Sequence, residues 1–234
     1  MGEGQSYLYP SGAGDGAVVI TGANRGIGLA LCRVYHERGA DVIALCRTAS
    51  PELVDLGVRI LDGVDFAESE AIPMLANALQ GQPIGLLINN AGVIGSDRLG
   101  DLERDRLLAQ FAVNTVAPVM VTDALAAQLA VGGKVVFISS IRGSLAENTT
   151  SGRYGYRMSK AALNMGALCL AHDLKARGIS VATVHPGSVG TGMSQGQGYL
   201  SPEESARAIM AVTDQVSLAN TGCFWDYSGQ QIPW

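Results

Sequence analysis

Charged residues are scarce in this sequence and are not clustered. Only 16% of its 234 residues are charged, and the 16 lysines and arginines are scattered, giving a formal net charge of −5. Binding to nucleic acid requires clustered Lys and Arg side chains that neutralise phosphates. The composition therefore argues against a nucleic-acid partner.

Cysteines and long apolar runs are also few. No close pairing and no metal-ligand spacing occurs among the four cysteines, Cys32, Cys46, Cys169 and Cys223. Each falls in an apolar stretch, where a free thiol packs as a small hydrophobic group. No apolar run approaches the ~20 residues needed to span a bilayer, and the N-terminus lacks the regions of a signal peptide. We expect a soluble, reduced, cytoplasmic protein with no membrane partner.

The histidines do not indicate a metal site. His36 and His172 fall on expected helices near charged neighbours, and His185 ends an expected strand, where packing or a cofactor contact is the simpler role. No Cys, His or Asp spacing matches a metal-binding pattern. We therefore expect no metal.

Glycine and apolar residues are abundant. The chain has 30 glycines and is 47% hydrophobic, which is typical of buried strands joined by tight turns. Residues 1–15 are rich in Gly and polar groups without periodicity, and we expect a flexible N-terminal extension there. Residues 16–234 have the length of one large domain, and no proline-rich linker divides them.

Short apolar runs alternate with amphipathic patterns through this domain. The expected strands are Ala17–Thr21, Asp41–Leu45, Val58–Leu61, Ile84–Asn89, Lys134–Ser139, Ile179–His185 and Gly222–Asp226. The expected helices are Ile27–Arg38, Glu68–Leu79, Leu99–Val113, Val116–Leu129, Tyr154–Arg177 and Pro202–Val212. Such alternation requires parallel strands with right-handed crossovers. The predicted fold is α/β, a doubly wound parallel sheet of Rossmann type with about seven strands and helices on both faces.

A glycine-rich turn follows the first expected strand and opens the first expected helix. Gly22 and Gly26 would let the backbone turn and approach a pyrophosphate, and Gly28 would let helix and strand pack closely. The cofactor-binding residues expected in this turn are Gly22, Asn24, Arg25, Gly26, Ile27 and Gly28. The pattern indicates a dinucleotide site.

The second strand bears on the choice of dinucleotide. NAD-binding proteins usually place an acidic residue about twenty residues beyond the glycines, but Asp41 starts this strand and Glu52 lies beyond it. The strand runs into Arg47, which together with Arg25 could hold a 2′-phosphate. We expect NADP(H) rather than NAD(H).

Tyr156 and Lys160 stand four residues apart on an expected helix and follow the paired Ser139-Ser140. Residues four apart share one helix face, so the phenol and the ammonium can share a site. A phenol ionises near pH ~10, and a neighbouring fixed cation lowers that pKa. The pair therefore indicates proton transfer at a carbonyl or an alcohol.

In these motifs the chain resembles the short-chain dehydrogenase/reductase family, from Val18 to Trp234, and within it the C-factor and sniffer-type carbonyl reductase branch. The segments that resemble the family are the glycine turn, Asn89-Asn90-Ala91-Gly92, Asn114, Ser140 with Tyr156 and Lys160, and Pro186-Gly187 followed by Val189 and Thr191. The branch resemblance also rests on the run Gly155–Asn164 and on the ending Asp226–Trp234.

The resemblance implies a role for each segment. Asn90, Ala91 and Gly92 would support the sheet beside the cofactor, and Pro186, Gly187, Val189 and Thr191 would hold the nicotinamide carboxamide. Asp65 would contact the adenine. The neighbouring Asp62 leaves the register of that motif open, and a solvated turn acid is the alternative for Asp65.

The same resemblance implies hydride transfer between NADP(H) and a small-molecule carbonyl or alcohol substrate. Tyr156 would give the proton, Lys160 would lower its pKa and bond the nicotinamide ribose, and Ser140 would hold the substrate oxygen. Asn114 would complete a tetrad by holding a water. Sixteen residues separate Ser140 from Tyr156, more than is common in the family, which makes Ser144 a rival for the hydroxyl role. We expect Ser140 to have that role, because it ends a strand and has a fixed position, while Ser144 falls in a loop.

Several alternatives remain open. A signalling or regulatory protein could keep this fold and bind the cofactor with little turnover, and an oxidation of an alcohol would use the same residues. The glycine-rich segment Ser188–Ser201 is expected to be a mobile loop beside the substrate. The helices within 99–129 and 154–177 resemble those that pair in family members, so a homodimer or homotetramer is possible.

Overall fold

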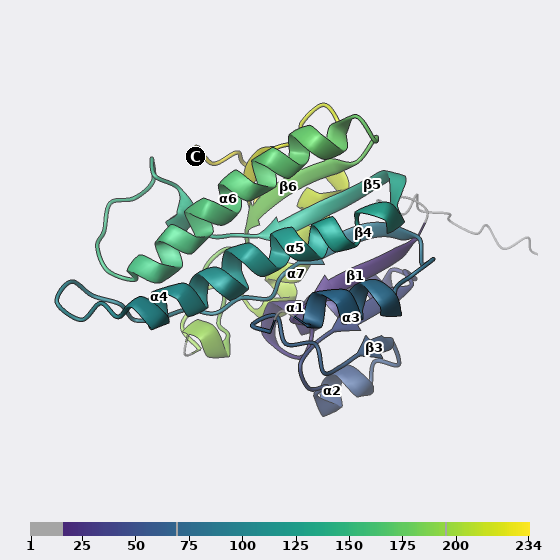
Figure 1. Ribbon diagram of the computed structural model, residues 1–234, viewed down its shortest axis with the longest axis horizontal. Helices are drawn as coiled ribbons and strands as arrows, with labels where there is room; N and C mark the ends of the chain where they lie inside the picture. Colours follow the sequence, from purple (N-terminus) through teal and green to yellow (C-terminus); the bar gives the residue numbers. More distant parts are fainter. Residues whose placement is uncertain (1–15, 69, 195) are drawn as a thin grey trace, which may run out of the picture.

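The computed structural model describes residues 16–68, 70–194 and 196–234 and contains one seven-stranded sheet (Figure 1). The predicted N-terminal extension, residues 1–15, lies outside the described residues. The strands are β1 (Ala17–Thr21), β2 (Val42–Leu45), β3 (Arg59–Leu61), β4 (Ile84–Asn89), β5 (Leu129–Ile138), β6 (Ser180–His185) and β7 (Cys223–Asp226). Their order is β3-β2-β1-β4-β5-β6-β7, and every neighbouring pair is parallel. This confirms the predicted doubly wound sheet.

Helices cover both faces of the sheet. They are α1 (Gly26–Glu37), α2 (Pro51–Val54), α3 (Ala71–Ala78), α4 (Arg104–Phe111), α5 (Ala117–Ala124), α6 (Tyr154–Lys175) and α7 (Pro202–Gln215). One apolar core joins α3, α5 and α6 to the sheet, and the other joins α1 and α7 to the opposite face. Because both faces are covered, β1, β2 and β4 are buried along their whole length.

The sheet reverses its winding between β1 and β4. From β1 the chain proceeds outward to β2 and β3, then returns to β4 on the other side and continues to β7. In sheets of this kind, ligands bind outside the carboxyl ends of the strands at such a reversal. The glycine turn and the Asn89–Gly92 segment follow these two strands, so the topology brings them together.

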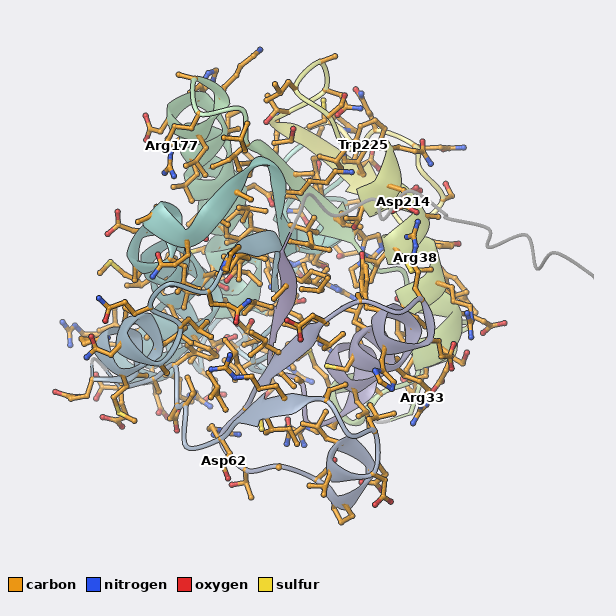
Figure 2. All side chains as sticks on the ribbon, turned by 90° about the vertical axis from the view of Figure 1, so that its right-hand side faces the viewer. Arg33, Arg38, Asp62, Arg177, Asp214 and Trp225 are labelled. Atoms are coloured by element: carbon orange, nitrogen blue, oxygen red, sulfur yellow. The ribbon has the colours of Figure 1, made fainter. Side chains whose placement is uncertain are left out.

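Salt bridges connect α1 and α7 along their length. Arg38 lies beside Asp214 (Figure 2), with Nη1 to Oδ2 at 2.8 Å, and Arg33 Nη1 lies 2.6 Å from Glu203 Oε1. The hydroxyl of Ser201 accepts a hydrogen bond from the Glu204 N–H, and the Glu204 carboxylate accepts one from the Ser201 N–H, a capping box that begins α7. These polar contacts lie beside the apolar contact between α1 and α7.

One prediction about the helices was wrong. The two helices expected within 99–129 form one continuous helix from Arg104 to Ala124, because a π-helical turn at Ala112–Val116 joins α4 to α5. Leu99–Glu103 precede the helix, and Leu129 already belongs to β5. A π-turn inside an α-helix is uncommon and frequently marks a functional site. The turn here contains Asn114.

This continuous helix also bears on the expectation that no apolar run approaches the length needed to span a bilayer. Among the described residues, the stretch Arg104–Ala124 alone is long and apolar enough to cross a membrane, by length and composition only. Buried core helices pass the same test. Its residues Ala117 and Val121 pack in the core beneath the sheet, and in Figure 1 the helix lies beside α6.

Smaller differences concern element ends and the cysteines. β5 begins at Leu129 instead of Lys134, α3 begins at Ala71, and the short α2 was not predicted. Cys32 and Cys46 are buried as expected, but Cys169 is exposed, because it lies on the outer side of α6.

Candidate active site

The glycine turn after β1 is shaped by close backbone packing. Gly22 and Gly26 have φ values of +65° and +56°, which residues with a Cβ adopt rarely. A Cβ at Gly28 would overlap the carbonyl oxygen of Gly22 and lie 2.6 Å from Asn90 Nδ2. The turn therefore opens α1 with its N–H groups free of side-chain caps, as a dinucleotide phosphate site requires.

The Asn89–Gly92 segment holds this turn from the neighbouring strand. The Thr21 hydroxyl accepts hydrogen bonds from the backbone N–H of Asn90 at 2.9 Å and of Ala91 at 3.0 Å. Asn90 Nδ2 donates to the carbonyl oxygens of Thr21 and Gly22 at 2.9 and 3.2 Å. Asn90 and Ala91 thus lie where they were predicted, beside the glycine turn.

The predicted adenosine-side residues also come together. Arg47 follows β2, and its Nη1 lies 3.8 Å from Asp65 Oδ2, with both side chains partly exposed. Asp65 Oδ1 accepts a hydrogen bond from the Ala67 backbone at 3.0 Å, so Asp65 also forms the local turn that was the alternative for it. Arg25, at the start of α1, is exposed as well. An exposed Arg47 beside the reversal point can contact an anionic ligand.

Buried polar contacts fix the N-terminus of α6. The Asp97 carboxylate accepts hydrogen bonds from the Gly155 N–H at 3.2 Å and from Gln110 Nε2 at 2.8 Å. Gln110 Oε1 in turn accepts from the Gly95 N–H at 2.8 Å. A carboxylate beside the first turn of a helix satisfies a free N–H and interacts favourably with the helix dipole. No sequence pattern predicts the roles of Asp97 and Gln110, because both residues are distant from α6 along the chain.

The first turns of α6 place Tyr156 and Lys160 against the end of β5. Tyr156, Ser140 and Lys160 are 8%, 6% and 4% exposed, and the Ser140 side chain lies close enough to the Tyr156 hydroxyl to lower its pKa. Lys160 Nζ donates to the Ile138 carbonyl oxygen at 2.8 Å and lies 5.9 Å from the centre of the Tyr156 ring. The structure therefore brings the three predicted catalytic residues together.

The turn after β5 rests directly on α6. A Cβ at Gly143 would lie 2.8 Å from the Lys160 backbone, so only glycine allows this approach. Ser139 Oγ donates to Asn164 Oδ1 at 2.6 Å, and Asn164 Nδ2 donates to the Gly143 carbonyl at 3.3 Å. Asn164, one turn beyond Lys160, therefore helps to hold the strand end that carries Ser140.

Ser144, the rival for the hydroxyl role, is occupied elsewhere. Its Oγ donates to the Pro233 carbonyl oxygen at 2.6 Å and accepts from the Glu147 N–H at 3.1 Å. Ser144 thus anchors the C-terminal segment, and the contact with Tyr156 comes from Ser140.

Burial dominates the ionisation of the site. It raises the pKa of Tyr156, while the Ser140 side chain and the charges of Arg142 and Arg153 act in the opposite direction. Burial also lowers the pKa of Lys160 to about 8. Ser140, Arg142 and Arg153 are thus the groups that lower the Tyr156 pKa, and the predicted effect of Lys160 is not among them.

Asn114 joins the segment after β4 to α6. Its Nδ2 donates to the Val93 carbonyl at 2.9 Å and to Ser159 Oγ at 3.0 Å, and its Oδ1 accepts from the Val93 N–H at 2.8 Å. A Cβ at Gly92 would lie 3.3 Å from Asn114 Oδ1 and 3.7 Å from Lys160 Nζ. The side-chain amide is thus a structural link beside Lys160, and its role in holding a water stays a prediction.

The segment after β6 completes the rim of the site. The Pro186 carbonyl accepts a hydrogen bond from Ser205 Oγ at 2.7 Å, and Val189 bridges to Leu200. Gly26 and Thr191 lie close, since a Cβ at Gly26 would be 3.4 Å from Thr191 Cγ2. His185 is half-buried, and desolvation lowers its pKa to about 4.

Residues 16–199 match the family model described as short chain dehydrogenase. The chain belongs to this family. A 1-hydroxy-2-glutathionyl-2-methyl-3-butene dehydrogenase of Rhodococcus sp. (strain AD45) is 34% identical over 223 residues, covering 93% of this chain and 99% of the relative. The C-signal protein of Myxococcus xanthus is 39% identical over 155 residues, which cover 65% of this chain and 93% of that protein.

Solved structures of the family share this architecture. The carbonyl reductase Sniffer of D. melanogaster has a TM-score of 0.87 and 28% identity, covering 94% of this chain and 99% of the other. A short-chain dehydrogenase/reductase from Burkholderia multivorans with bound NADP has a TM-score of 0.85 and 28% identity over the same shares. These matches confirm the predicted family and its sniffer-type branch.

The buried ammonium of Lys160 predicts a pH-dependent stability difference. Burial lowers its pKa from 10.5 to about 8, so between these values the unfolded chain binds more protons than the folded one. The destabilisation caused by burying the charged ammonium is fully present below about pH 8 and decreases as the pH rises toward 10.5, the pKa in the unfolded chain. Relative to Lys160→Met, the cofactor-free wild type should therefore gain up to about 3 kcal/mol in unfolding free energy over this range.

Urea denaturation of both proteins at several pH values between about 7 and 10 measures this difference. Lys175→Met serves as the control, because Lys175 is an exposed lysine on the same helix. It should show no such trend. A difference between wild type and Lys160→Met that stays constant, or shrinks for the wild type at high pH, would contradict the assignment.

Proposed function

We propose that this protein is an NADP(H)-dependent oxidoreductase of the carbonyl reductase type, with Tyr156 as the general acid and base. The observation that carries the proposal is the meeting of Tyr156, Ser140 and Lys160, all buried, at the carboxyl end of β5. Tyr, Ser and Lys residues that served only as separate surface groups would not be buried together in this way. Their site adjoins the reversal point of the sheet, where a dinucleotide would bind.

Each residue of the site has a separate role in proton transfer. When bound, the nicotinamide supplies or accepts the hydride. Tyr156 gives its proton to the carbonyl oxygen during reduction and takes it back during oxidation. Ser140 holds that oxygen by a hydrogen bond that strengthens as negative charge develops. Lys160, already beside the Tyr156 ring, would contact the cofactor ribose and thereby bring ring and substrate into reach.

The chain fits a bound dinucleotide. The glycine turn leaves the N-terminus of α1 open to a pyrophosphate, and Gly92 keeps the space beside Lys160 free of a side chain. Arg47 and Arg25 are both exposed and can supply positive charge for a 2′-phosphate. The NADP bound to the Burkholderia multivorans protein supports the same choice.

The relatives support a carbonyl or alcohol substrate without deciding the direction. The Rhodococcus relative is named as a dehydrogenase of a glutathionyl alcohol, and Sniffer is named as a carbonyl reductase. Both reactions use one acid–base group, which protonates the oxygen in one direction and deprotonates it in the other.

A second candidate is a signalling protein that binds the cofactor with little turnover, which the likeness to C-signal favours. Burial of three groups suited to proton transfer supports the enzyme instead. Consumption of NADPH with a panel of aldehydes and ketones separates the two, since a pure binder would show cofactor binding without consumption. A cytoplasmic location and pairing through α4, α5 and α6 remain predictions.

Replacing Tyr156 by Phe should lower kcat about 10²- to 10⁴-fold, because the ring remains while the transferable proton is lost. Binding of NADPH should persist. Steady-state rates with a reducible aldehyde and fluorescence titration with NADPH measure the two effects. Tyr154→Phe, two residues earlier on α6, is the matched control and should retain the wild-type rate. Normal turnover by Tyr156→Phe would exclude Tyr156 as the proton donor.

Replacing Arg47 by Ala should weaken NADPH binding about tenfold or more while changing NADH binding little, since hydrogen bonds to charged groups contribute about 1.5–3 kcal/mol. The variant would also leave Asp65 without its neighbouring cation, which disfavours a phosphate further. Dissociation constants for both cofactors test this.

Arg59→Ala is the control for Arg47→Ala, because Arg59 is an exposed arginine at the opposite end of the adjacent strand pair. It should leave both constants near the wild-type values. If Arg47→Ala weakened the binding of NADPH and NADH equally, Arg47 would contribute general positive charge and not a contact with the 2′-phosphate.

A further inference from the structure

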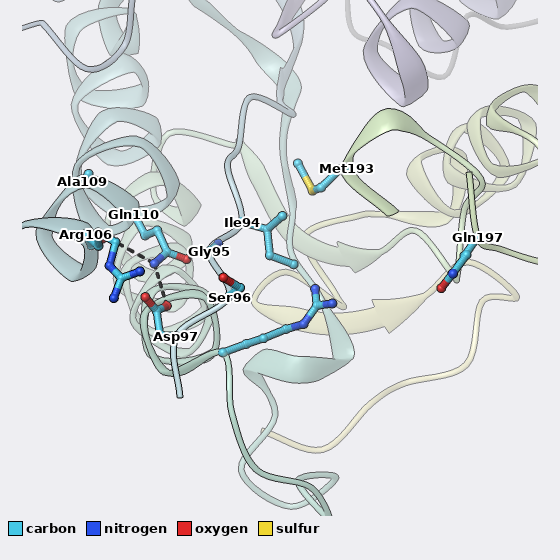
Figure 3. A pocket seen from close by; sticks show the side chains of 10 residues that line it. Ile94, Gly95, Ser96, Asp97, Arg106, Ala109, Gln110, Met193 and Gln197 are labelled. Carbon is cyan, nitrogen blue, oxygen red and sulfur yellow. Dashed lines mark hydrogen bonds between the residues drawn. The ribbon is translucent and has the colours of Figure 1, made fainter. Parts of the chain in front are cut away.

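A cavity of about 490 Å³ opens beside the N-terminus of α6. Its walls come from the segment after β4, from α4, and from the segment after β6, including Ile94, Gln110 and Met193. Figure 3 shows Met193 and Gln197 facing the Asp97–Gln110 side across this space. Arg153 also lines it, three residues before Tyr156. Arg153 is the N-cap residue of α6 and its charge acts on Tyr156, so this wall of the cavity lies near the proposed proton donor.

Arg153 has an unusual backbone conformation. With φ +53° and ψ +46°, it is the only non-glycine residue with positive φ in the described ranges. A non-glycine residue in this region costs on the order of 1 kcal/mol and often lies at a functional site. Its N–H donates to the Asp97 carbonyl oxygen at 2.7 Å, which fixes the position just before α6. An arginine stands here although glycine would fit the backbone more easily.

The positive charge around the cavity is only partly neutralised. Arg106 is paired with Asp101 and Glu103, at 3.1 and 3.2 Å. By contrast, no ion pair or side-chain hydrogen bond links the guanidinium groups of Arg153 or Arg142 to any residue within the described parts of the chain.

The Asp97 carboxylate lines the cavity together with Arg153, but within the described residues it forms no ion pair with Arg153 or Arg142. The Asp97 carboxylate is fully buried; its Oδ2 accepts from Gln110 and Gly155, and its Oδ1 has no partner among the described residues. Arg157 binds neutral acceptors at Gly152 and Asn148. The charges of Arg142 and Arg153 both reach the Tyr156 hydroxyl. Both charged groups that act on the Tyr156 pKa are therefore positive.

We propose that this cavity binds a carboxylate carried by the substrate, with Arg153 as its anchor and Arg142 adding positive charge at the Tyr156 side. A guanidinium matches a carboxylate with two parallel hydrogen bonds, which fixes orientation as well as position. The inference rests on the proposed oxidoreductase function and narrows its substrates to carbonyl compounds or alcohols that bear a carboxylate remote from the reacting carbon.

A matched substrate pair tests the inference. Para-carboxybenzaldehyde and the methyl ester of the same acid present the same reacting aldehyde and differ in the remote charge. The NADPH-loaded wild type should reduce the acid with the higher kcat/KM, mainly through a lower KM. In Arg153→Met the ratio of kcat/KM for acid over ester should fall about 10- to 100-fold, the range expected for a charge-assisted hydrogen bond.

Two further variants separate a specific contact from general charge. Arg153→Lys should restore part of the ratio, because the positive charge returns without the planar fork. Arg104→Met removes an 84% exposed arginine outside the cavity and should leave the ratio unchanged. A wild-type ratio near one, or an unchanged ratio in Arg153→Met, overturns the carboxylate site while leaving the reductase function intact.

A binding measurement keeps the test independent of turnover. Terephthalate carries the carboxylate but no reducible carbonyl, so calorimetry with the NADPH-loaded protein reports the anchor alone. Binding to the wild type that weakens about tenfold or more in Arg153→Met supports the site even where neither aldehyde is reduced, an outcome that would count against the proposed function only. Equal binding by both proteins overturns the inference.

Discussion

The burial of one ammonium group underlies the arrangement of the site. Lys160 is almost wholly enclosed, and its Nζ donates to the last carbonyl of β5. Burying a charge without a counter-charge is unfavourable, so the position persists only because the surroundings hold α6 firmly. Asp97 at the helix start, the close approach of Gly143 and the bond from Ser139 to Asn164 supply that support. The ammonium of Lys160 thus lowers the stability of the fold but is held in position for the proposed proton transfer.

The electrostatics of Tyr156 arise from several elements. Burial raises its pKa, and the opposing influences are Ser140 from the end of β5 and two arginines from the segments between β5 and α6. A phenol in such surroundings stays protonated at neutral pH, which suits an acid that donates to a carbonyl oxygen. The exposed arginines can also meet an anion, so they connect proton transfer with substrate choice.

The long helix over the sheet shows how packing overrides local preference. The pattern within 99–129 indicates two amphipathic helices, yet one helix with a π-turn forms. Asn114 lies in that turn, and its amide bonds to the Val93 backbone and Ser159. Those contacts join the segment after β4 to α6. The π-turn thus carries the side chain that links this segment to the helix of Lys160.

Local sequence by itself determined the strand-helix alternation, the parallel sheet and the glycine turn, because apolar periodicity and glycine act over a few neighbouring residues. It also placed Tyr156 and Lys160 on one helix face. Only the tertiary structure showed what Ser144 binds instead, merged α4 with α5, and brought Asp97 to the first turn of α6 and Arg142 and Arg153 toward the phenol. These outcomes depend on contacts between segments far apart in the chain, and on burial, which no local pattern encodes.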